Sequence, residues 1–356
     1  KNIFTSGKIY QEILKKEENG EYLGETVQVV PHVTDNIQNR LIEVGEGHDI
    51  VVAEIGGTVG DFESRSFYEA IRQFKNRLKD DVLIVMVAPI ILNHTVNELK
   101  TKPLQNAVMA LQSTGLQPEM LLCRSETKIP DAILDKVSRL TNVPRVAVFE
   151  APDVDSIYKV PIEFFDRDID DLIADRFRLE RNGIKIKKYQ NLVEKYINGK
   201  NLPIVTIGIV GKYENTDEAY LSLKEALLHA AVSNDVKVNI CWLNAEKFTI
   251  EDLRNVNGVI VPGGFDSRGV EGKIKSIRWC REQKVPFLGI CLGLQCAVIE
   301  FARNCMKIES ATSQEFDNNC EYPVIHFVDG QTCNIKKSGN MRLGAYDCAL
   351  ENDSIV

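Results

Sequence analysis

The sequence predicts an α/β protein built from two parallel-sheet domains. Apolar segments rich in β-branched residues alternate with segments whose apolar residues recur three and four positions apart. This alternation runs twice along the chain, and a highly charged stretch separates the two runs. A length of 356 residues also suits two domains. We therefore expect one domain at 1–174, a linker at 175–202 and a second, doubly wound domain at 203–356.

Each predicted element follows from its local pattern. Strands are expected where short apolar runs lead into glycine or proline or lie between polar turns, and helices where the apolar period is close to 3.6. In the first domain these rules give strands at 49–55, 82–88, 120–123 and 146–149, and helices at 67–78 and 104–113. In the second they give strands at 205–210, 237–242, 258–261 and 286–290, and helices at 218–231, 274–283 and 292–303.

Composition narrows the functional classes. Lys and Arg total 43 against 51 Asp and Glu, a net charge of −8, and no basic block is long enough to follow a phosphate backbone, so a nucleic-acid partner is not expected. Neither a membrane span nor a signal peptide is expected, because no long apolar run and no apolar leader segment occur. Nine cysteines without a C-x-x-C pair indicate free thiols and a cytoplasmic location.

A cysteine occupies a strand-to-helix turn in the second domain. The pattern Gly289-x-Cys291-x-Gly293 follows the strand at 286–290 and opens the next helix, which is the arrangement of a nucleophile elbow. Flanking glycines permit the tight turn, and a helix N-terminus favours the thiolate. Taken alone, the pattern fits a small buried residue between packing glycines equally well.

A second loop favours the catalytic interpretation. The strand at 258–261 ends in Pro262-Gly263-Gly264, and the two motifs in this order resemble the class I glutamine amidotransferases. The resemblance implies that Cys291 attacks the side-chain amide of L-glutamine and releases ammonia. It also implies that the oxyanion and the glutamine are bound by Gly264, Leu292, Gly293, Leu294, Gln295 and Glu315.

The proton acceptor of that family is missing from these residues. The family carries an H-x-E pair after the nucleophile, whereas the only histidine beyond Cys291 is His326, with no glutamate two places later. His326 lies in a strand-like segment and is interpreted as a strand residue. The chain as given is therefore expected to hydrolyse glutamine poorly or not at all.

The first domain carries two motifs suited to anions and metal ions. Glu54 comes at the end of a predicted buried strand and is followed by a glycine-rich loop that reaches Asp61, a pattern that suits Mg²⁺ or phosphate. Lys100 and Lys102 precede a helix that starts at a proline. Cations are unfavourable at a helix N-terminus, so either these lysines are solvated or an anion lies between them and the helix.

Together with His32 in VQVVPH, DVDSIY at 153–158 and MRLG at 341–344, these motifs resemble the CTP synthase family over essentially the whole chain. The resemblance implies a P-loop-type amidoligase domain joined to the amidotransferase domain. It implies phosphorylation of UTP at O4 by Mg-ATP and displacement of the phosphate by ammonia. GTP is the implied activator, CTP the implied inhibitor, and a homotetramer the implied assembly.

The same resemblance assigns residues to the nucleotides. Glu54 is the implied Mg²⁺ ligand, and 268–272 lies near the implied GTP site. UTP and CTP are assigned to Asp61, Phe62, Glu63, Lys100, Thr101, Lys102, Pro103, Leu104, Gln105 and Lys136, and ATP to Pro152, Asp153 and Val154.

Some family features are absent or altered. No G-x-x-x-x-G-K-S/T run occurs, 88–99 differs from the family's loop, and Pro152 stands where a lysine is usual. We therefore expect a truncated chain, incomplete at both ends and inactive by itself. One alternative is a catalytically dead nucleotide-binding homologue with a regulatory or scaffold role. Another is a glutaminase subunit of a different synthetase. Formation of CTP from ammonia distinguishes a synthase from both.

Overall fold

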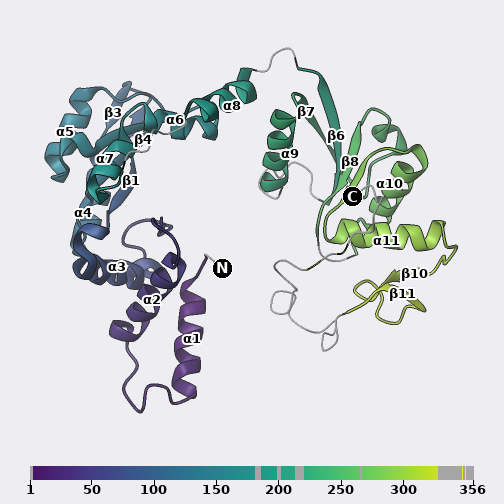
Figure 1. The fold of residues 1–356 in the computed structure, drawn as a ribbon, viewed down its shortest axis with the longest axis horizontal. Coiled ribbons are helices and arrows are strands. Elements are labelled where there is room, and N and C mark those ends of the chain that lie inside the picture. Colours follow the sequence, from purple (N-terminus) through teal and green to yellow (C-terminus); the bar gives the residue numbers. More distant parts are fainter. Residues whose placement is uncertain are drawn as a thin grey trace. The chain divides into compact units, whose positions relative to one another are not determined.

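The computed structural model describes residues 3–180, 186–198, 202–212, 220–264, 267–327, 347 and 349. The chain forms two compact units, 1–193 and 194–356, and each is described by itself below (Figure 1). Both units contain a parallel sheet with helices against it, which confirms the predicted fold class. The predicted boundaries at 174/175 and 202/203 remain a prediction.

The first unit is organised around a three-stranded parallel sheet. Its strands are β1 (Val85–Pro89), β4 (Met120–Ser125) and β5 (Val148–Pro152), in the order β1-β4-β5. Three amphipathic helices pack with it, namely α3 (Arg65–Leu78), α4 (Lys102–Ser113) and α5 (Asp131–Thr141). Fully buried side chains from helices and strands, including Leu104, Leu121 and Val137, form the core.

Several elements of the first unit escaped prediction. Two helices near the N-terminus, α1 (Ser6–Glu18) and α2 (Thr34–Gly45), form a small second core with α3. A hairpin of β2 (Ile91–Asn93) and β3 (Glu98–Lys100) fills the stretch before α4. After β5 follow α6 (Val160–Phe165) and α7 (Ile169–Phe177), and α7 reaches into the predicted linker. Helix α8 (Ile186–Asn198) was expected, because the second half of the charged linker was interpreted as helical.

The strand predicted at 49–55 was wrong. Residues 50–55 adopt no strand, and Val52 is 92% exposed. A strand needs backbone partners as well as apolar side chains. Within the described residues, β1 is bonded to β4 along one edge only, and the apolar run at 50–55 pairs with no strand. Glu54 therefore lies in an exposed extended segment, not at the end of a buried strand.

Two other strands are shifted from their predicted positions. The strand predicted at 82–88 begins at Val85, because a 3-10 turn at Lys79–Asp81 precedes it. It buries only alternate residues, so Met86 and Ala88 face the core while Val87 is 60% exposed. The strand predicted at 146–149 begins at Val148, after a second 3-10 turn at Arg145–Ala147.

The second unit has the predicted doubly wound topology. Its four parallel strands are β6 (Ile204–Gly211), β7 (Lys237–Asn244), β8 (Gly258–Val261) and β9 (Phe287–Gly289), in the order β7-β6-β8-β9. The helices are α9 (Leu221–Ser233), α10 (Val270–Gln283) and α11 (Leu292–Asn304), and a short parallel pair follows, β10 (Ala311–Ser313) with β11 (Tyr322–Ile325). The strand order reverses between β6 and β8. Ligands of such sheets bind outside the carboxyl ends of the strands near this reversal.

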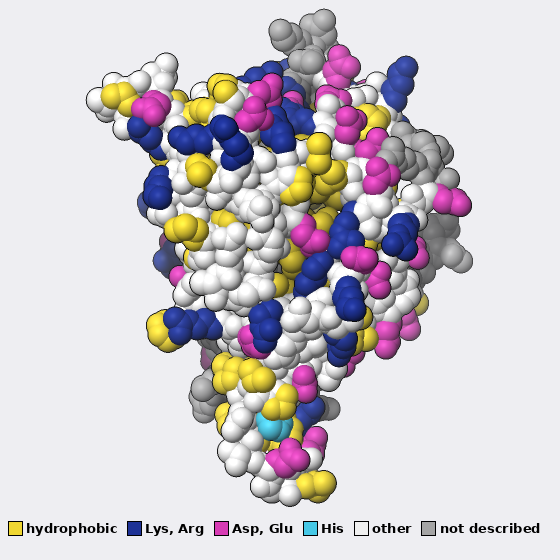
Figure 2. Space-filling view, turned by 90° about the vertical axis from the view of Figure 1, so that its left-hand side faces the viewer, with side chains coloured by type: hydrophobic (Ala, Val, Ile, Leu, Met, Phe, Trp, Pro, Cys, Tyr) yellow, Lys and Arg dark blue, Asp and Glu magenta, His cyan; other side chains and the backbone are white. Residues whose placement is uncertain are grey.

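Charged side chains of both signs intermingle on the face of the molecule shown in Figure 2. Among the described residues, no helix is both long enough and apolar enough to cross a bilayer.

One carboxylate connects four segments of the first unit. Glu119, just before β4, accepts hydrogen bonds from Lys75 of α3 at 2.8 Å, from Arg176 of α7 at 3.0 Å and from the N–H of Ile84 at 3.1 Å. Burial alone would raise the pKa of Glu119, but these three donors outweigh it and lower the pKa. The ionised form is therefore favoured in the folded state.

We predict that Glu119→Gln lowers the free energy of unfolding of the first unit by about 1–3 kcal/mol at pH 7, because charge-assisted hydrogen bonds are lost. A depressed folded pKa contributes stability above the unfolded pKa of about 4.3, and that contribution disappears as the pH falls through the folded pKa. The free energy of unfolding, measured with denaturant, should therefore differ less between Glu119→Gln and the unaltered protein at pH 3.5 than at pH 7. Asp80→Asn removes a 76% exposed partner of the same Arg176 and should change little. An equal effect of the two substitutions would contradict this account.

Candidate functional site

The nucleophile elbow is present as predicted. Cys291 directly precedes α11 and has φ 53° and ψ −108°, a left-handed conformation that non-glycine residues rarely adopt. It is exposed, and its carbonyl accepts a hydrogen bond from the N–H of Gln295 at 3.1 Å. The thiol therefore projects at the carboxyl edge of the sheet, beside the N-terminus of a 13-residue helix.

Glycines allow the elbow to pack against the sheet. A Cβ on Gly293 would lie 2.0 Å from the carbonyl oxygen of Val261, and one on Gly289 would lie 2.6 Å from the carbonyl carbon of Gly293. The loop after β8 lies against the nucleophile, since a Cβ on Gly263 would lie 3.3 Å from Cβ of Cys291. Three backbone segments thus meet at van der Waals distance around the cysteine.

The predicted oxyanion donors are neighbours. A Cβ on Gly264 would lie 3.5 Å from Cδ2 of Leu292, so the glycine loop and the first residue of α11 are in contact. Leu292 is buried, and so is Gly293 after it. The loop after β8 and the start of α11 therefore lie together beside Cys291.

The residues predicted to hold glutamine differ in exposure. Gln295 is half-buried in the first turn of α11, whereas Leu294 is 59% exposed. Glu315 is exposed two residues after β10, and its N–H donates to Ser313 Oγ at 3.2 Å. His326 is exposed and follows β11 by one residue, so it lies just outside the strand to which it was assigned.

Two other cysteines of the second unit are unsuited to nucleophilic chemistry. Burial raises the pKa of Cys280 to about 12 and that of Cys296 to about 11. Both side chains lie in the core formed by the sheet, α10 and α11. Their thiols remain protonated near neutral pH.

In the first unit, Glu54 and Asp61 belong to one glycine loop. The N–H of Thr58 donates to Asp61 Oδ2 at 3.0 Å, and Gly57 has φ 90°, which a side chain would strain. The described residues contain no cluster of three or more His, Cys, Asp or Glu fit to hold a metal alone. Mg²⁺ is commonly held by one or two carboxylates with substrate phosphates, and these two exposed carboxylates fit that arrangement.

The structure groups the predicted lysines around an acidic residue. Lys100 Nζ lies 2.5 Å from Glu98 Oε2 within β3. The pKa of Glu98 is lowered mainly by the hydrogen bond and charge of Lys100, and further by the charge of Lys136 on α5. Lys100 and Lys136 thus act on the same carboxylate although they are 36 positions apart in the sequence. Sequence reasoning missed Glu98, which directly neighbours the motif.

The start of α4 combines binding and packing residues. Thr101 is its N-cap and Pro103 lies in its first turn. Gln105 Nε2 donates to Thr101 Oγ1 at 2.8 Å, and Lys102 is exposed. The side chain of Leu104 is fully buried in the core, so only its backbone is available to a ligand.

The predicted adenine segment is held at the end of β5. Pro152 is buried and ends the strand, Asp153 is exposed, and Val154 is half-buried. Arg124 of β4 donates to Asp153 Oδ1 at 2.5 Å. The N–H of Asp153 donates to the carbonyl of Ser125 at 2.9 Å, which extends the β4–β5 pairing by one residue.

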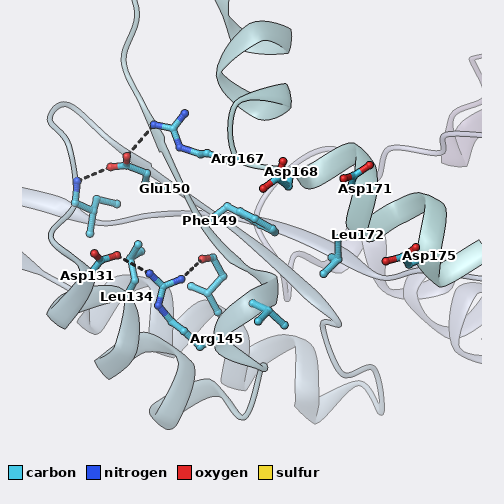
Figure 3. A pocket seen from close by; sticks show the side chains of 13 residues that line it. Asp131, Leu134, Arg145, Phe149, Glu150, Arg167, Asp168, Asp171, Leu172 and Asp175 are labelled. Atoms are coloured by element: carbon cyan, nitrogen blue, oxygen red, sulfur yellow. Dashed lines mark hydrogen bonds and ion pairs between the residues drawn. The ribbon is translucent and has the colours of Figure 1, made fainter. Parts of the chain in front are cut away.

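A hollow of about 670 Å³ between α5, β5 and α7 contains none of the predicted site residues (Figure 3). Its two arginines are already paired. Arg145 donates to Asp131 at 2.7 Å, and Arg167 donates to Glu150 at 2.8 Å. Burial alone would raise the pKa of Glu150, but the Ile129 N–H and Arg167 outweigh it and lower the pKa. The hollow is lined by ion pairs that join structural elements.

Comparison with known proteins decides the family. Residues 1–179 match the family model described as the CTP synthase N-terminus, and residues 216–352 match that of the class-I glutamine amidotransferases. The chain belongs to the CTP synthase family. Glutamine-dependent amination of UTP to CTP is the activity of CTP synthases.

Individual CTP synthases match over nearly the whole chain. The CTP synthase of Methanocaldococcus jannaschii is 46% identical over 100% of this chain, which spans 67% of that protein. That of Methanococcus maripaludis is 43% identical over 100% of the chain and 68% of its own length. A solved structure, the glutaminase domain of Trypanosoma brucei CTPS with bound acivicin, is 33% identical, covers 39% of this chain and 55% of its own, and has a TM-score of 0.35.

Two glycine substitutions test the elbow around Cys291. Gly293→Ala places a methyl group 2.0 Å from the Val261 carbonyl, a clash with backbone that no side-chain rotation relieves. We expect a loss of about 1–3 kcal/mol or more in stability, together with loss of glutaminase activity. Thermal unfolding and glutamate release from glutamine, both in the whole protein as its gene encodes it, measure the two effects.

Gly264→Ala is the matched control. Its methyl group would meet Leu292 and Lys273 at 3.5 and 3.7 Å, which are ordinary contacts. If Gly264 acts through its N–H, this variant keeps its stability and most of its activity. A normally active Gly293→Ala variant would show that the close contact with β8 is unnecessary.

Proposed function

We propose that this chain carries residues of both reaction centres of a glutamine-hydrolysing CTP synthase. The observation that carries the proposal is the exposed Cys291 at the elbow, with the Gly263-Gly264 loop beside it, in a chain whose first 179 residues match the CTP synthase N-terminus. The nitrogen source is glutamine, the acceptor is UTP, and ATP supplies the activating phosphate.

In the glutaminase half, the Cys291 thiolate attacks the side-chain amide carbon of glutamine. The carbonyl π electrons move to oxygen, and the N–H groups of Gly264 and Leu292 stabilise the resulting oxyanion. Collapse releases ammonia, and water then hydrolyses the thioester to glutamate. Gln295 and Glu315 hold the substrate. This cycle needs a proton acceptor, so a polypeptide restricted to these 356 residues, without an H-x-E pair, is expected to be inactive.

In the synthetase half, UTP O4 takes the γ-phosphoryl group of ATP, and ammonia displaces that phosphate to give CTP, ADP and phosphate. Lys100, Lys102 and Lys136 bind the UTP triphosphate, and the first-turn N–H groups of α4 add favourable dipoles. Asp153 and Val154 meet adenine. Glu54, with Asp61 nearby, holds Mg²⁺, which neutralises phosphate charge when bound.

The proposed function as a CTP synthase also implies how the protein is regulated and assembled. We propose a cytoplasmic homotetramer that GTP activates near 268–272 and that CTP inhibits by occupying the pyrimidine site at Asp61, Phe62 and Glu63. Phe62 is 78% exposed, with the Arg65 guanidinium 4.1 Å from its ring centre. An exposed aromatic ring of this kind suits contact with a nucleobase.

We predict that Cys291→Ala, made in the whole protein as its gene encodes it, abolishes CTP formation from glutamine but leaves CTP formation from ammonia unchanged. The expected loss with glutamine is at least about 1,000-fold, because nucleophilic catalysis is removed. Absorbance of CTP against UTP follows both reactions. No CTP from either nitrogen source in the unaltered protein would instead favour a catalytically dead homologue.

Lys100→Met tests the nucleotide site. We expect the half-saturating concentration of UTP in the ammonia reaction to rise by about 10-fold or more, since one charge-assisted phosphate contact is lost. Lys128→Met is the control, because Lys128 is an exposed lysine of the same unit outside the proposed site. Unchanged UTP saturation in Lys100→Met would remove Lys100 from the site.

A further inference from the structure

A buried lysine lies directly against the oxyanion loop. Lys273 stands in the first turn of α10, and only 2% of its surface is exposed. Its Nζ is 3.7 Å from the point where a Cβ on Gly264 would sit, and Leu292 Cδ2 is 3.5 Å from the same point. Gly264 is therefore enclosed by the other proposed oxyanion donor and by an ammonium group.

The charge of Lys273 also reaches the beginning of α11. Burial raises the pKa of Cys296, and among the charges that act on this thiol Lys273 is the largest and lowers the pKa. Glu271 and Arg303 act on the same thiol with opposite signs, and they are paired with each other at 2.9 Å. The Lys273 ammonium therefore acts electrostatically on a buried thiol near the start of α11.

Burial of a lysine is costly unless its environment compensates for lost hydration. The neighbouring buried positions of α10, Val270, Ile274 and Ile277, are apolar. An apolar side chain at 273 would fill the same space without a desolvation penalty. The Lys273 ammonium is nevertheless held inside the protein, next to the Gly264 segment.

We propose that Lys273 is a positioning residue of the glutaminase reaction: its ammonium holds the Gly264 segment in place and adds positive potential where the oxyanion forms. Lys273 neither gains nor loses a proton in this step, and the negative charge develops on the former amide oxygen. The inference rests on the proposed function, because it assumes that Cys291 attacks glutamine and that Gly264 is an oxyanion donor.

The test uses Lys273→Met in the whole protein as its gene encodes it. Methionine keeps the length of the side chain and removes the charge. We expect kcat for the glutamine reaction to fall about 10- to 100-fold, somewhat less than for loss of a direct oxyanion donor, with KM for glutamine changed less than about 3-fold. CTP formation from ammonia and the thermal unfolding temperature should stay unchanged.

Lys275→Met is the matched control. Lys275 is exposed on the same helix two residues further on, so this variant loses an equal charge away from the loop. Its glutamine and ammonia reactions should both remain normal. A loss of glutamine activity in Lys275→Met equal to that in Lys273→Met would overturn the inference, because net charge alone would then explain the effect.

A tetrahedral adduct gives a second readout. The aldehyde analogue of glutamine, glutamate γ-semialdehyde, adds to a cysteine thiol to form a thiohemiacetal whose oxygen occupies the oxyanion position. We expect its inhibition constant to rise in Lys273→Met by about the same factor as kcat/KM falls, while inhibition by glutamate stays constant. A structural role would weaken both ligands together.

These outcomes distinguish the proposed role of Lys273 from the proposed function of the chain. Full glutaminase activity in Lys273→Met, or a parallel loss of the ammonia reaction and of thermal stability, overturns the role of Lys273 alone. Glutamine-dependent CTP formation that survives Cys291→Ala overturns the proposed function itself.

Discussion

The glutaminase centre depends on one close backbone contact, at which β8, β9 and α11 meet without side chains between them. Gly293 lies against the Val261 carbonyl, and Gly289 lies against Gly293. Backbone atoms cannot move aside as a side chain can, so this contact fixes the start of α11 relative to two strand ends. Cys291 must then turn the chain within one residue, which accounts for its left-handed conformation. The position of the thiol follows from packing around it.

The first unit relies on side-chain charge instead. Lys100 is paired with Glu98 shortly before α4 begins, and the charge of Lys136 acts on the same carboxylate. A triphosphate brings several negative charges and would compete with the single carboxylate for the same ammonium groups. Binding therefore exchanges one ion pair for several, and the exposed position of these groups allows the exchange at little desolvation cost. The fully buried Leu104 anchors this helix start to the core beneath.

The sequence predicted the second unit far better than the first. Strands β6 to β9 and helix α11 lie within a few residues of their predicted bounds, because each has a strong local pattern. Strands β6, β8 and β9 also end at or beside a glycine or proline. The strand predicted at 49–55 was wrong for a physical reason. Apolar side chains favour a strand, but a strand forms only where a neighbouring backbone supplies hydrogen-bond partners. Helix α1 was missed although it buries Ile9 and Ile13, four positions apart, and helix α2 was missed as well.

Whether a part of the site could be predicted also depends on whether backbone or side-chain groups do the chemistry. Chemistry performed by backbone groups requires glycines at fixed places, so the elbow around Cys291 was readable from the sequence. Chemistry that depends on the burial of a charge leaves no such pattern, because a lysine looks the same in sequence whether solvated or enclosed. The only hint for Lys273 was its place within the apolar stripe of α10, between Val270 and Ile274. The structure shows how close the Lys273 ammonium lies to the oxyanion loop, and the strength of an electrostatic effect depends on that distance.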